Sequence, residues 1–282
     1  MKNKVVVITG GTSGIGKALA YTFGNRGSKI FISGRNQDAL DQTVSELLEK
    51  QIIVRGILAD SALESDNERL INAAVEHFGA IDILICNAGI SMRALFEDVN
   101  LDAFRQVMDI NFYGTVYAVK YALPHILKRK GSVVGISSIN GHRSTPARSA
   151  YSASKFAMEG FLESLRTEVM HRGVHVLSVS PGFTASNIRN KALSASGKPQ
   201  GESPRNEARM MTSEAVAEQT YSAVIKRKRD LVLTFQGKLA VFLNKWIPGI
   251  MDRIVYNVMS RSEEHTSELQ SHLNLVCRLL LE

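Results

Sequence analysis

The stretch Lys4-Val-Val-Val-Ile-Thr9, followed by Gly10-Gly-Thr-Ser-Gly-Ile-Gly16 and Lys17-Ala-Leu-Ala-Tyr-Thr-Phe23, decides the fold. The β-branched run predicts a buried strand, the glycines predict a turn, and the last segment predicts a helix. In such a unit, free backbone N–H groups at the helix N-terminus favour a pyrophosphate group. We therefore predict a dinucleotide site in this turn. Its expected binding residues are Gly10, Thr12, Ser13, Gly14, Ile15 and Gly16.

Strand and helix patterns alternate along the rest of the chain. Further strands are predicted at 29–33, 52–58, 83–86, 175–179 and 231–234, and the run 133–139 is predicted to be a buried strand that ends in a loop at its hydroxyl residues. Helices are predicted at 38–49, 67–78 and 214–226. Alternation of this kind is typical of a parallel, doubly wound sheet. We therefore predict a Rossmann-type α/β fold with seven parallel strands and helices on both faces.

The end of the second predicted strand indicates which dinucleotide binds. Gly34-Arg35-Asn36 stands where an NAD site places a carboxylate against the ribose 2′-hydroxyl, and no acid is present there. Arg35 instead offers a planar, permanently charged group that suits a 2′-phosphate. The pattern favours NADP(H). The alternative interpretation is that Arg35 is a solvated residue at the start of a helix.

A tyrosine and a lysine lie one helical turn apart in Ser149-Ala-Tyr-Ser-Ala-Ser-Lys155. The cation is expected to lower the pKa of the phenol, so that Tyr151 can exchange a proton with a carbonyl. Alone, such a spacing is more typical of a surface pair. Ser138, thirteen residues before Tyr151, follows a predicted buried strand and is expected to meet the helix.

Composition limits the class of protein. With 282 residues and 44% hydrophobic content, the chain can bury the core of one α/β domain or of two small ones. Two cysteines are too few for a disulfide framework and indicate a reducing compartment. The net charge of +7 comes without basic runs interleaved with aromatics, so no nucleic-acid partner is expected. Without a signal peptide or membrane span, the expected location is the cytoplasm.

Several motifs together resemble those of the short-chain dehydrogenase/reductase family. They occur in family order between residue 3 and about residue 234. The motifs are Thr9-Gly-Gly-Thr-Ser-Gly-Ile-Gly16, Asn87-Ala-Gly89, Asn111, Ser138, Tyr151-x-x-x-Lys155 and Pro181-Gly182.

The resemblance implies a catalytic role for four residues, and it implies no metal. Ser138 would polarise the substrate carbonyl, and Tyr151 would donate the proton in reduction. Lys155 would lower the tyrosine pKa and bind the nicotinamide ribose, while Asn111 would hold a water on the lysine and extend a proton relay. From the residues alone, Asn111 reads as a structural cap, and Ser137 is the alternative to Ser138.

The resemblance also extends the cofactor site. Asn87, Ala88 and Gly89 would steady the sheet beside the cofactor, and Asp60 would bind the adenine. Pro181 and Gly182 would face the nicotinamide. The family usually carries its amide-binding hydroxyl at the position of Ser186, but Thr184 is a second candidate here.

Three functions fit these motifs. The leading one is an NADPH-dependent carbonyl reductase or alcohol dehydrogenase that acts on a hydrophobic ketone, as a homodimer or homotetramer. A 3-oxoacyl-carrier-protein reductase resembles the chain through the same motifs. A catalytically silent NADP-binding regulatory protein is the third, although such a binder has no need of Ser138 and Tyr151.

The expected organisation has three parts. Residues 1–236 form the catalytic domain, with a substrate lid at 185–211 where the sequence is rich in Ser, Asn, Gly and Pro. Residues 237–260 form an amphipathic extension that Pro248-Gly249 should divide into two helices. Residues 261–282 resemble the translation of a sequencing-library adapter and are expected to be no part of the native fold.

The extension has three candidate roles. Its apolar stripe can pack on the domain, form a homodimer interface, or lie in a membrane surface with Trp246 at the headgroups and Lys238, Lys245 and Arg253 toward anionic lipid. The extension resembles those of reductases related to the hydroxysteroid dehydrogenases, whose substrates dissolve in lipid.

Overall fold

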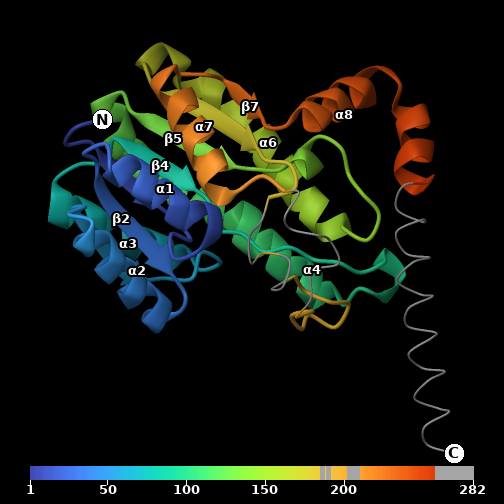
Figure 1. The fold of residues 1–282 in the computed structure, drawn as a ribbon, viewed down its shortest axis with the longest axis horizontal. Coiled ribbons are helices and arrows are strands. Elements are labelled where there is room, and N and C mark those ends of the chain that lie inside the picture. Colours follow the sequence, from blue (N-terminus) through green and yellow to red (C-terminus); the bar gives the residue numbers. More distant parts are fainter. Residues whose placement is uncertain (185–187, 189–191, 202–209, 258–282) are drawn as a thin grey trace, which may run out of the picture. The chain divides into compact units, whose positions relative to one another are not determined.

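The computed structural model describes residues 1–184, 188, 192–201 and 210–257. The chain divides into two compact units, Met1–Lys238 and Leu239–Glu282. The first unit contains one seven-stranded sheet flanked by helices (Figure 1). The expected adapter-like tail, 261–282, lies outside the described residues.

All neighbouring strands of the sheet pair in parallel, in the order β3-β2-β1-β4-β5-β6-β7. The strands are β1 (Val5–Ile8), β2 (Lys29–Gly34), β3 (Val54–Leu58), β4 (Ile83–Cys86), β5 (Ser132–Ile136), β6 (His175–Ser180) and β7 (Asp230–Val232). The predicted Rossmann-type fold is confirmed. Because β1 pairs with both β2 and β4, the strand order reverses between β1 and β4, which is where open α/β sheets bind ligands.

Helices cover both faces of the sheet. In chain order, the α-helices up to Trp246 are α1 (Gly14–Gly24), α2 (Gln37–Glu49), α3 (Glu64–Phe78), α4 (Leu101–Met108), α5 (Gly114–Arg129), α6 (Ser149–Val169), α7 (Ser213–Ile225) and α8 (Phe235–Trp246). Successive strand residues point to opposite faces, so Val6 and Ile8 pack with α1, α2 and α7, and Val7 packs with α3, α5 and α6. Figure 1 shows α1 and α7 side by side.

Helix α3 begins at Glu64, three residues before its predicted start. Glu64 and Asp66 stabilise its first turn through the helix dipole. Asn67, expected at the start, lies inside the helix, where its side-chain amide donates to the carbonyls of Ser61 and Leu63. The apolar periodicity begins only after this polar turn, so the sequence pattern missed it.

The helix that follows β7 ends where the sequence predicts a break. Helix α8 stops at Trp246, Ile247 is not helical, and residues 248–257 form a second helix. Pro248 supplies the first position of that second helix, where its missing N–H costs nothing. Within the described ranges, no helix has the length and apolar character needed to cross a membrane.

Candidate active site

The glycine turn joins β1 to α1 in a conformation that only small residues allow. Gly10 and Gly14 adopt positive φ angles of 64° and 50°. A Cβ on Gly16 would lie 2.2 Å from the carbonyl oxygen of Gly10, so this position requires glycine. The residues predicted from the turn therefore come together at the N-terminus of α1.

Asn87 joins the carboxyl ends of β1 and β4. Its side-chain amide donates to the carbonyls of Thr9 at 3.0 Å and Gly10 at 2.9 Å. The Thr9 hydroxyl in return accepts from the backbone N–H groups of Asn87 and Ala88, both at 3.1 Å. The predicted Asn87-Ala88-Gly89 segment thus lies directly against the glycine turn.

Asn111 lies in a π-helical turn, Asp109–Tyr113, between α4 and α5. Its side chain is fully buried and exchanges hydrogen bonds of 2.8 and 2.9 Å with the backbone N–H and carbonyl of Ile90. It also donates to Ser154 Oγ at 2.9 Å. Asn111 is therefore more than a helix cap, because it fastens the segment after β4 to α6. Turns of this type often occur at functional sites.

Tyr151 and Lys155 lie in the first half of α6, as the spacing predicts. The Tyr151 phenol forms a side-chain hydrogen bond with Ser138, which follows β5. Lys155 is buried and donates to the carbonyl of Ile136 at 2.9 Å. A Cβ on Gly89 would lie 3.1 Å from Asn111 Oδ1 and 3.7 Å from Lys155 Nζ. The four predicted catalytic residues therefore meet at the carboxyl end of the sheet.

The two serines that follow β5 differ in what they contact. Ser138 Oγ accepts from the backbone N–H of Asn140 at 3.2 Å and bonds Tyr151. Ser137 Oγ is buried and forms no hydrogen bond within the described residues. A Cβ on Gly141 would lie 2.8 Å from Ser137 Oγ, which shows how closely the turn covers it. The geometry thus favours Ser138 over Ser137.

The pKa of Tyr151 does not move in the predicted direction. Burial raises the pKa of Tyr151, and the hydrogen bond to Ser138 and the charge of Arg148 only partly oppose it. Lys155 lies 5.9 Å from the centre of the tyrosine ring, and burial lowers its own pKa to about 8. The predicted lowering by Lys155 is therefore wrong for this structure, because desolvation outweighs the hydrogen bond to Ser138 and the charge of Arg148.

Two partners of the site were missed by sequence reasoning. Arg148 precedes the first turn of α6 and donates to Ser91 Oγ. Ser154 accepts from Asn111 and donates to the carbonyl of Tyr151 at 2.8 Å. Ser154 is 43 residues from Asn111 in the chain, so no local pattern could reveal their pairing.

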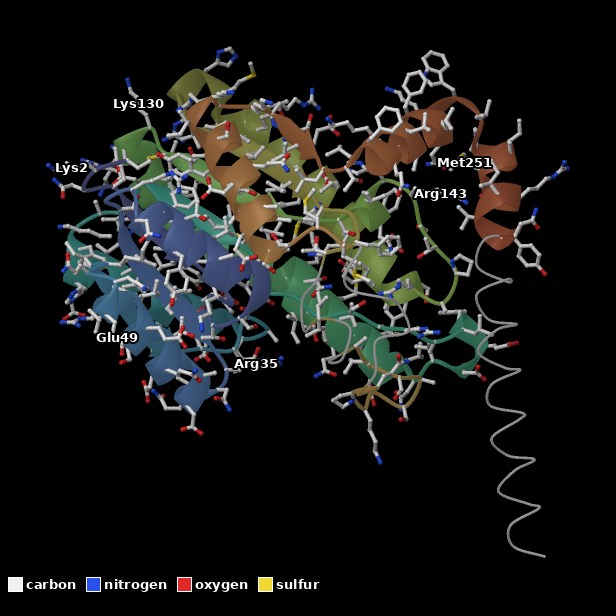
Figure 2. The ribbon with its side chains drawn as sticks, in the orientation of Figure 1. Lys2, Arg35, Glu49, Lys130, Arg143 and Met251 are labelled. Carbon is white, nitrogen blue, oxygen red and sulfur yellow. The ribbon has the colours of Figure 1, made fainter. Side chains whose placement is uncertain are left out.

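Arg35 and Asp60 lie close together beyond the ends of β2 and β3. Arg35 Nη1 is 4.0 Å from Asp60 Oδ2, and half of the arginine side chain is exposed. Figure 2 labels Arg35, the residue that follows β2. Asp60 Oδ1 also accepts from the backbone N–H of Ala62 at 3.0 Å. The two residues predicted to contact the adenosine half of a cofactor therefore share one surface.

The segment after β6 lies beside the turn that carries Ser138. The backbone N–H of Ile139 donates to the carbonyl of Pro181 at 3.1 Å. The hydroxyl of Thr184 is buried and donates to the carbonyl of Gly182 at 3.2 Å. Ser186, the alternative amide-binding hydroxyl, lies outside the described residues.

Part of the predicted lid packs on the segment that follows β4. Leu193 bridges to Met92, and the backbone N–H of Leu193 donates to the carbonyl of Ser91 at 2.8 Å. Leu193 belongs to an apolar cluster with Ile90, Met92 and Ala150, and Tyr151 packs against this cluster. The apolar side chains of this cluster therefore lie beside Tyr151. Positions 185–187, 189–191 and 202–209 of the lid lie outside the described residues.

Comparison with known proteins identifies the class. The family model for short chain dehydrogenases matches residues 4–196, more than half of the chain. The protein therefore belongs to the short-chain dehydrogenase/reductase family, whose fold binds a nicotinamide cofactor, and it is an oxidoreductase. The resemblance found in the sequence is confirmed.

Similar proteins come from animals and bacteria. Mouse dehydrogenase/reductase SDR family member 7B is 38% identical over 264 residues, which cover 90% of this chain and 81% of the mouse protein. A Drosophila melanogaster family protein 7-like is 32% identical, with 89% and 78% covered. A short-chain dehydrogenase/reductase from Burkholderia phymatum, solved in complex with NAD, superposes with a TM-score of 0.78 at 24% identity, covering 86% of this chain and 93% of its own.

Proposed function

We propose that this protein is an NADP(H)-dependent oxidoreductase that interconverts a hydrophobic ketone and a secondary alcohol. The observation that carries the proposal is the meeting of Ser138, Tyr151 and Lys155 beside the carboxyl ends of β4 and β5. The apolar cluster of Ile90, Met92, Ala150 and Leu193 beside Tyr151 supports a hydrophobic substrate.

The residues around the glycine turn fit a dinucleotide. Helix α1 begins at Gly14, and within the described residues the side chain of Ser13 caps none of its N–H groups. These donors suit a pyrophosphate. Larger side chains at Gly10 and Gly16 would collide with Ala88 and with the turn itself. The turn is therefore shaped for close approach of a ligand to backbone.

Arg35 supports NADP(H) over NAD(H). Its guanidinium stands after β2, where a ribose 2′-substituent is held in this fold. Asp60 is the only acid that the structure pairs with Arg35 in the described residues, and at 4.0 Å this pair is loose. The arginine is free to turn toward a phosphate at little cost.

Each catalytic residue acts on a specific atom. The cofactor, when bound, supplies a hydride for the carbonyl carbon. Ser138 donates a hydrogen bond to the carbonyl oxygen, and Tyr151 delivers its phenolic proton to that oxygen as charge develops. The raised pKa of Tyr151 keeps the phenol protonated and ready to act as an acid in reduction. Lys155 is placed one turn away to stabilise the phenolate that remains.

A substrate panel tests the proposal. The oxidation of NADPH and of NADH is measured with hydrophobic ketones, steroid ketones, aromatic ketones and 3-oxoacyl thioesters. We expect turnover with NADPH and a hydrophobic ketone. Exclusive turnover of acyl thioesters would favour the carrier-protein reductase, and cofactor binding without turnover of any substrate would favour a regulatory binder.

A further inference from the structure

A cluster of hydroxyls, one carboxylate and one imidazole lies directly behind the site. Glu159 of α6 stands one turn after Lys155 and points at β6, with 16% of its side chain exposed. Both of its carboxylate oxygens lie 2.7 Å from the Ser178 hydroxyl. Glu159 Oε1 also accepts from Ser180 Oγ at 3.2 Å. The carboxylate therefore ties α6 to the last residues of β6.

His142 joins the turn that carries Ser138 to this cluster. Its Nε2 lies 2.9 Å from Ser180 Oγ and 3.4 Å from Glu159 Oε1. A serine hydroxyl has one proton, and that of Ser180 is donated to Glu159, so Ser180 accepts from an N–H on His142 Nε2. Hydrogen bonds therefore connect Glu159 on α6, through Ser180 at the end of β6, to His142, the residue that follows Gly141.

The turn itself has little room to move. A Cβ on Gly141 would lie 3.1 Å from Glu159 Cγ and 3.1 Å from the carbonyl oxygen of Lys155. The turn therefore packs closely against α6 between Lys155 and Glu159. Its backbone hydrogen bonds reach β6 and the segment that follows it, and a second side-chain link to α6, besides that of Ser138 to Tyr151, passes through His142 and Glu159.

We propose that Glu159 and His142 are positioning residues, which hold the Ser138 turn and the Tyr151–Lys155 helix in register for proton transfer. This inference rests on the proposed function. It adds a second task for the carboxylate, because the charge of Glu159 favours the protonated form of Lys155. Other charged or titratable groups facing this region are Tyr151 on α6 and Cys86 on β4 for Lys155, and Arg166 on α6 for Glu159.

Glu159→Gln tests the charge. Glutamine keeps the shape and one acceptor oxygen but removes the negative charge. We expect kcat for ketone reduction to fall about tenfold to a hundredfold, as for a small displacement of a reacting group, with the KM for NADPH within about twofold. The alkaline limb of kcat against pH should move to lower pH, because burial then lowers the pKa of Lys155 unopposed by Glu159.

Glu163→Gln is the matched control. Glu163 lies one turn further along α6, is exposed, and pairs with Arg229 at 2.7 Å. The same chemical change there should leave kcat and the pH profile as in the wild type. A Glu159→Gln variant with the kcat and alkaline limb of this control would overturn the proposal, even if its melting temperature were lower.

Substitutions of His142 test the link between the Ser138 turn and Glu159 without changing any residue of α6. His142→Phe fills a similar volume but removes the donor, whereas His142→Gln restores an N–H at a similar reach. We expect kcat to fall in His142→Phe and to recover in His142→Gln, with the alkaline limb unmoved in both. Equal kcat in the wild type and His142→Phe would overturn the proposal, and this pair decides the matter if Glu159→Gln does not fold.

A wild type that turns over none of the panel substrates contradicts the proposed function itself. An active wild type whose Glu159→Gln and His142→Phe variants are equally active contradicts only the positioning roles.

Discussion

Burial of Lys155 disfavours the charged form of its side chain. Lys155 is 3% exposed, and burial lowers its pKa to about 8, although Glu159 and Cys86 oppose this shift. A group with this pKa is mostly protonated at neutral pH and loses its charge as the pH rises through about 8. The cation that we propose to stabilise a Tyr151 phenolate is therefore present at neutral pH and is lost in alkali.

Lys155→Met should impair both catalysis and cofactor binding, because the ammonium is expected to serve the tyrosine and the nicotinamide ribose. We expect kcat to fall by at least about a hundredfold, in line with the loss of a general acid–base partner. Binding of NADPH, followed by its fluorescence, should weaken as well. Lys128→Met, at an exposed position of α5, is the control. Unchanged NADPH affinity would show that Lys155 serves only the tyrosine.

Arg35→Asp should shift the cofactor preference from NADPH toward NADH. The substitution reverses the charge that would face a 2′-phosphate and supplies an acceptor for a ribose hydroxyl. The measurement is the ratio of kcat/KM for the two cofactors with one ketone. A ratio equal to that of the wild type would rule out Arg35 as the phosphate-reading residue.

The spacing of residues in the sequence correctly predicted contacts between residues that are near in the chain, and contacts that the fold class itself requires. The glycine turn and the Tyr151–Lys155 pair are of this kind. The contacts of Asn111 with Ile90 and Ser154 are not, because a π-helical turn and two distant segments create them. The direction of the Tyr151 pKa shift could not be predicted either, because it depends on the burial of the side chain, which the spacing of residues in the sequence does not reveal.

At the scale of elements, one buried carboxylate fastens the amino end of the sheet. Asp82, just before β4, accepts from the backbone N–H of Val5 at 3.0 Å and from Lys4 Nζ at 2.9 Å. Arg129, the last residue of α5, donates to it at 3.0 Å. Burial alone would raise the pKa of Asp82, but these hydrogen bonds outweigh it and hold the pKa below its usual value.

Asp82→Asn should therefore destabilise the fold by about 2 kcal/mol at pH 7, since the donors Lys4, Val5 and Arg129 lose their charged acceptor. A depressed carboxyl pKa adds stability that is present above the unfolded value of about 4 and is lost as the pH falls through the folded pKa. The difference between variant and wild type, measured by urea unfolding, should shrink in acid. A difference independent of pH would contradict this origin.

Periodicity predicted the order and type of the strands and helices better than their ends. The early start of α3 comes from polar residues that satisfy the helix dipole and backbone, which an apolar pattern does not register. The break after α8 was predictable because the restriction that proline imposes is local.

At the scale of the whole molecule, Leu239–Glu282 form a second compact unit that follows the unit with the sheet along the chain. Phe242 and Trp246 lie one turn apart on α8, with ring centres 6.4 Å apart, in a stripe that continues in the sequence through Ile250 and Ile254. Lys238, Lys245 and Arg253 accompany it. We propose that this extension makes a peripheral contact with an anionic membrane surface in the cytoplasm.

Co-sedimentation with anionic liposomes measures this contact. The wild type should pellet with the vesicles at low salt, and binding should fall with rising salt because the cations are screened. Trp246→Glu should bind less at any salt concentration, since it places a charge in the apolar stripe. A wild type that stays in the supernatant at low salt would leave a homodimer interface or packing on the catalytic unit as the role of the extension.

Proton transfer from Tyr151 during NADPH-dependent ketone reduction can be tested by following the transfer of an isotope to the product. Wild type and Tyr151→Phe are supplied with NADPH deuterated at the transferring position and with a ketone that the wild type accepts. We expect deuterium at the carbinol carbon with the wild type and almost none with Tyr151→Phe, at equal NADPH binding, because the ring still packs but the transferable proton is absent. More than a few per cent of wild-type transfer in the variant would contradict it.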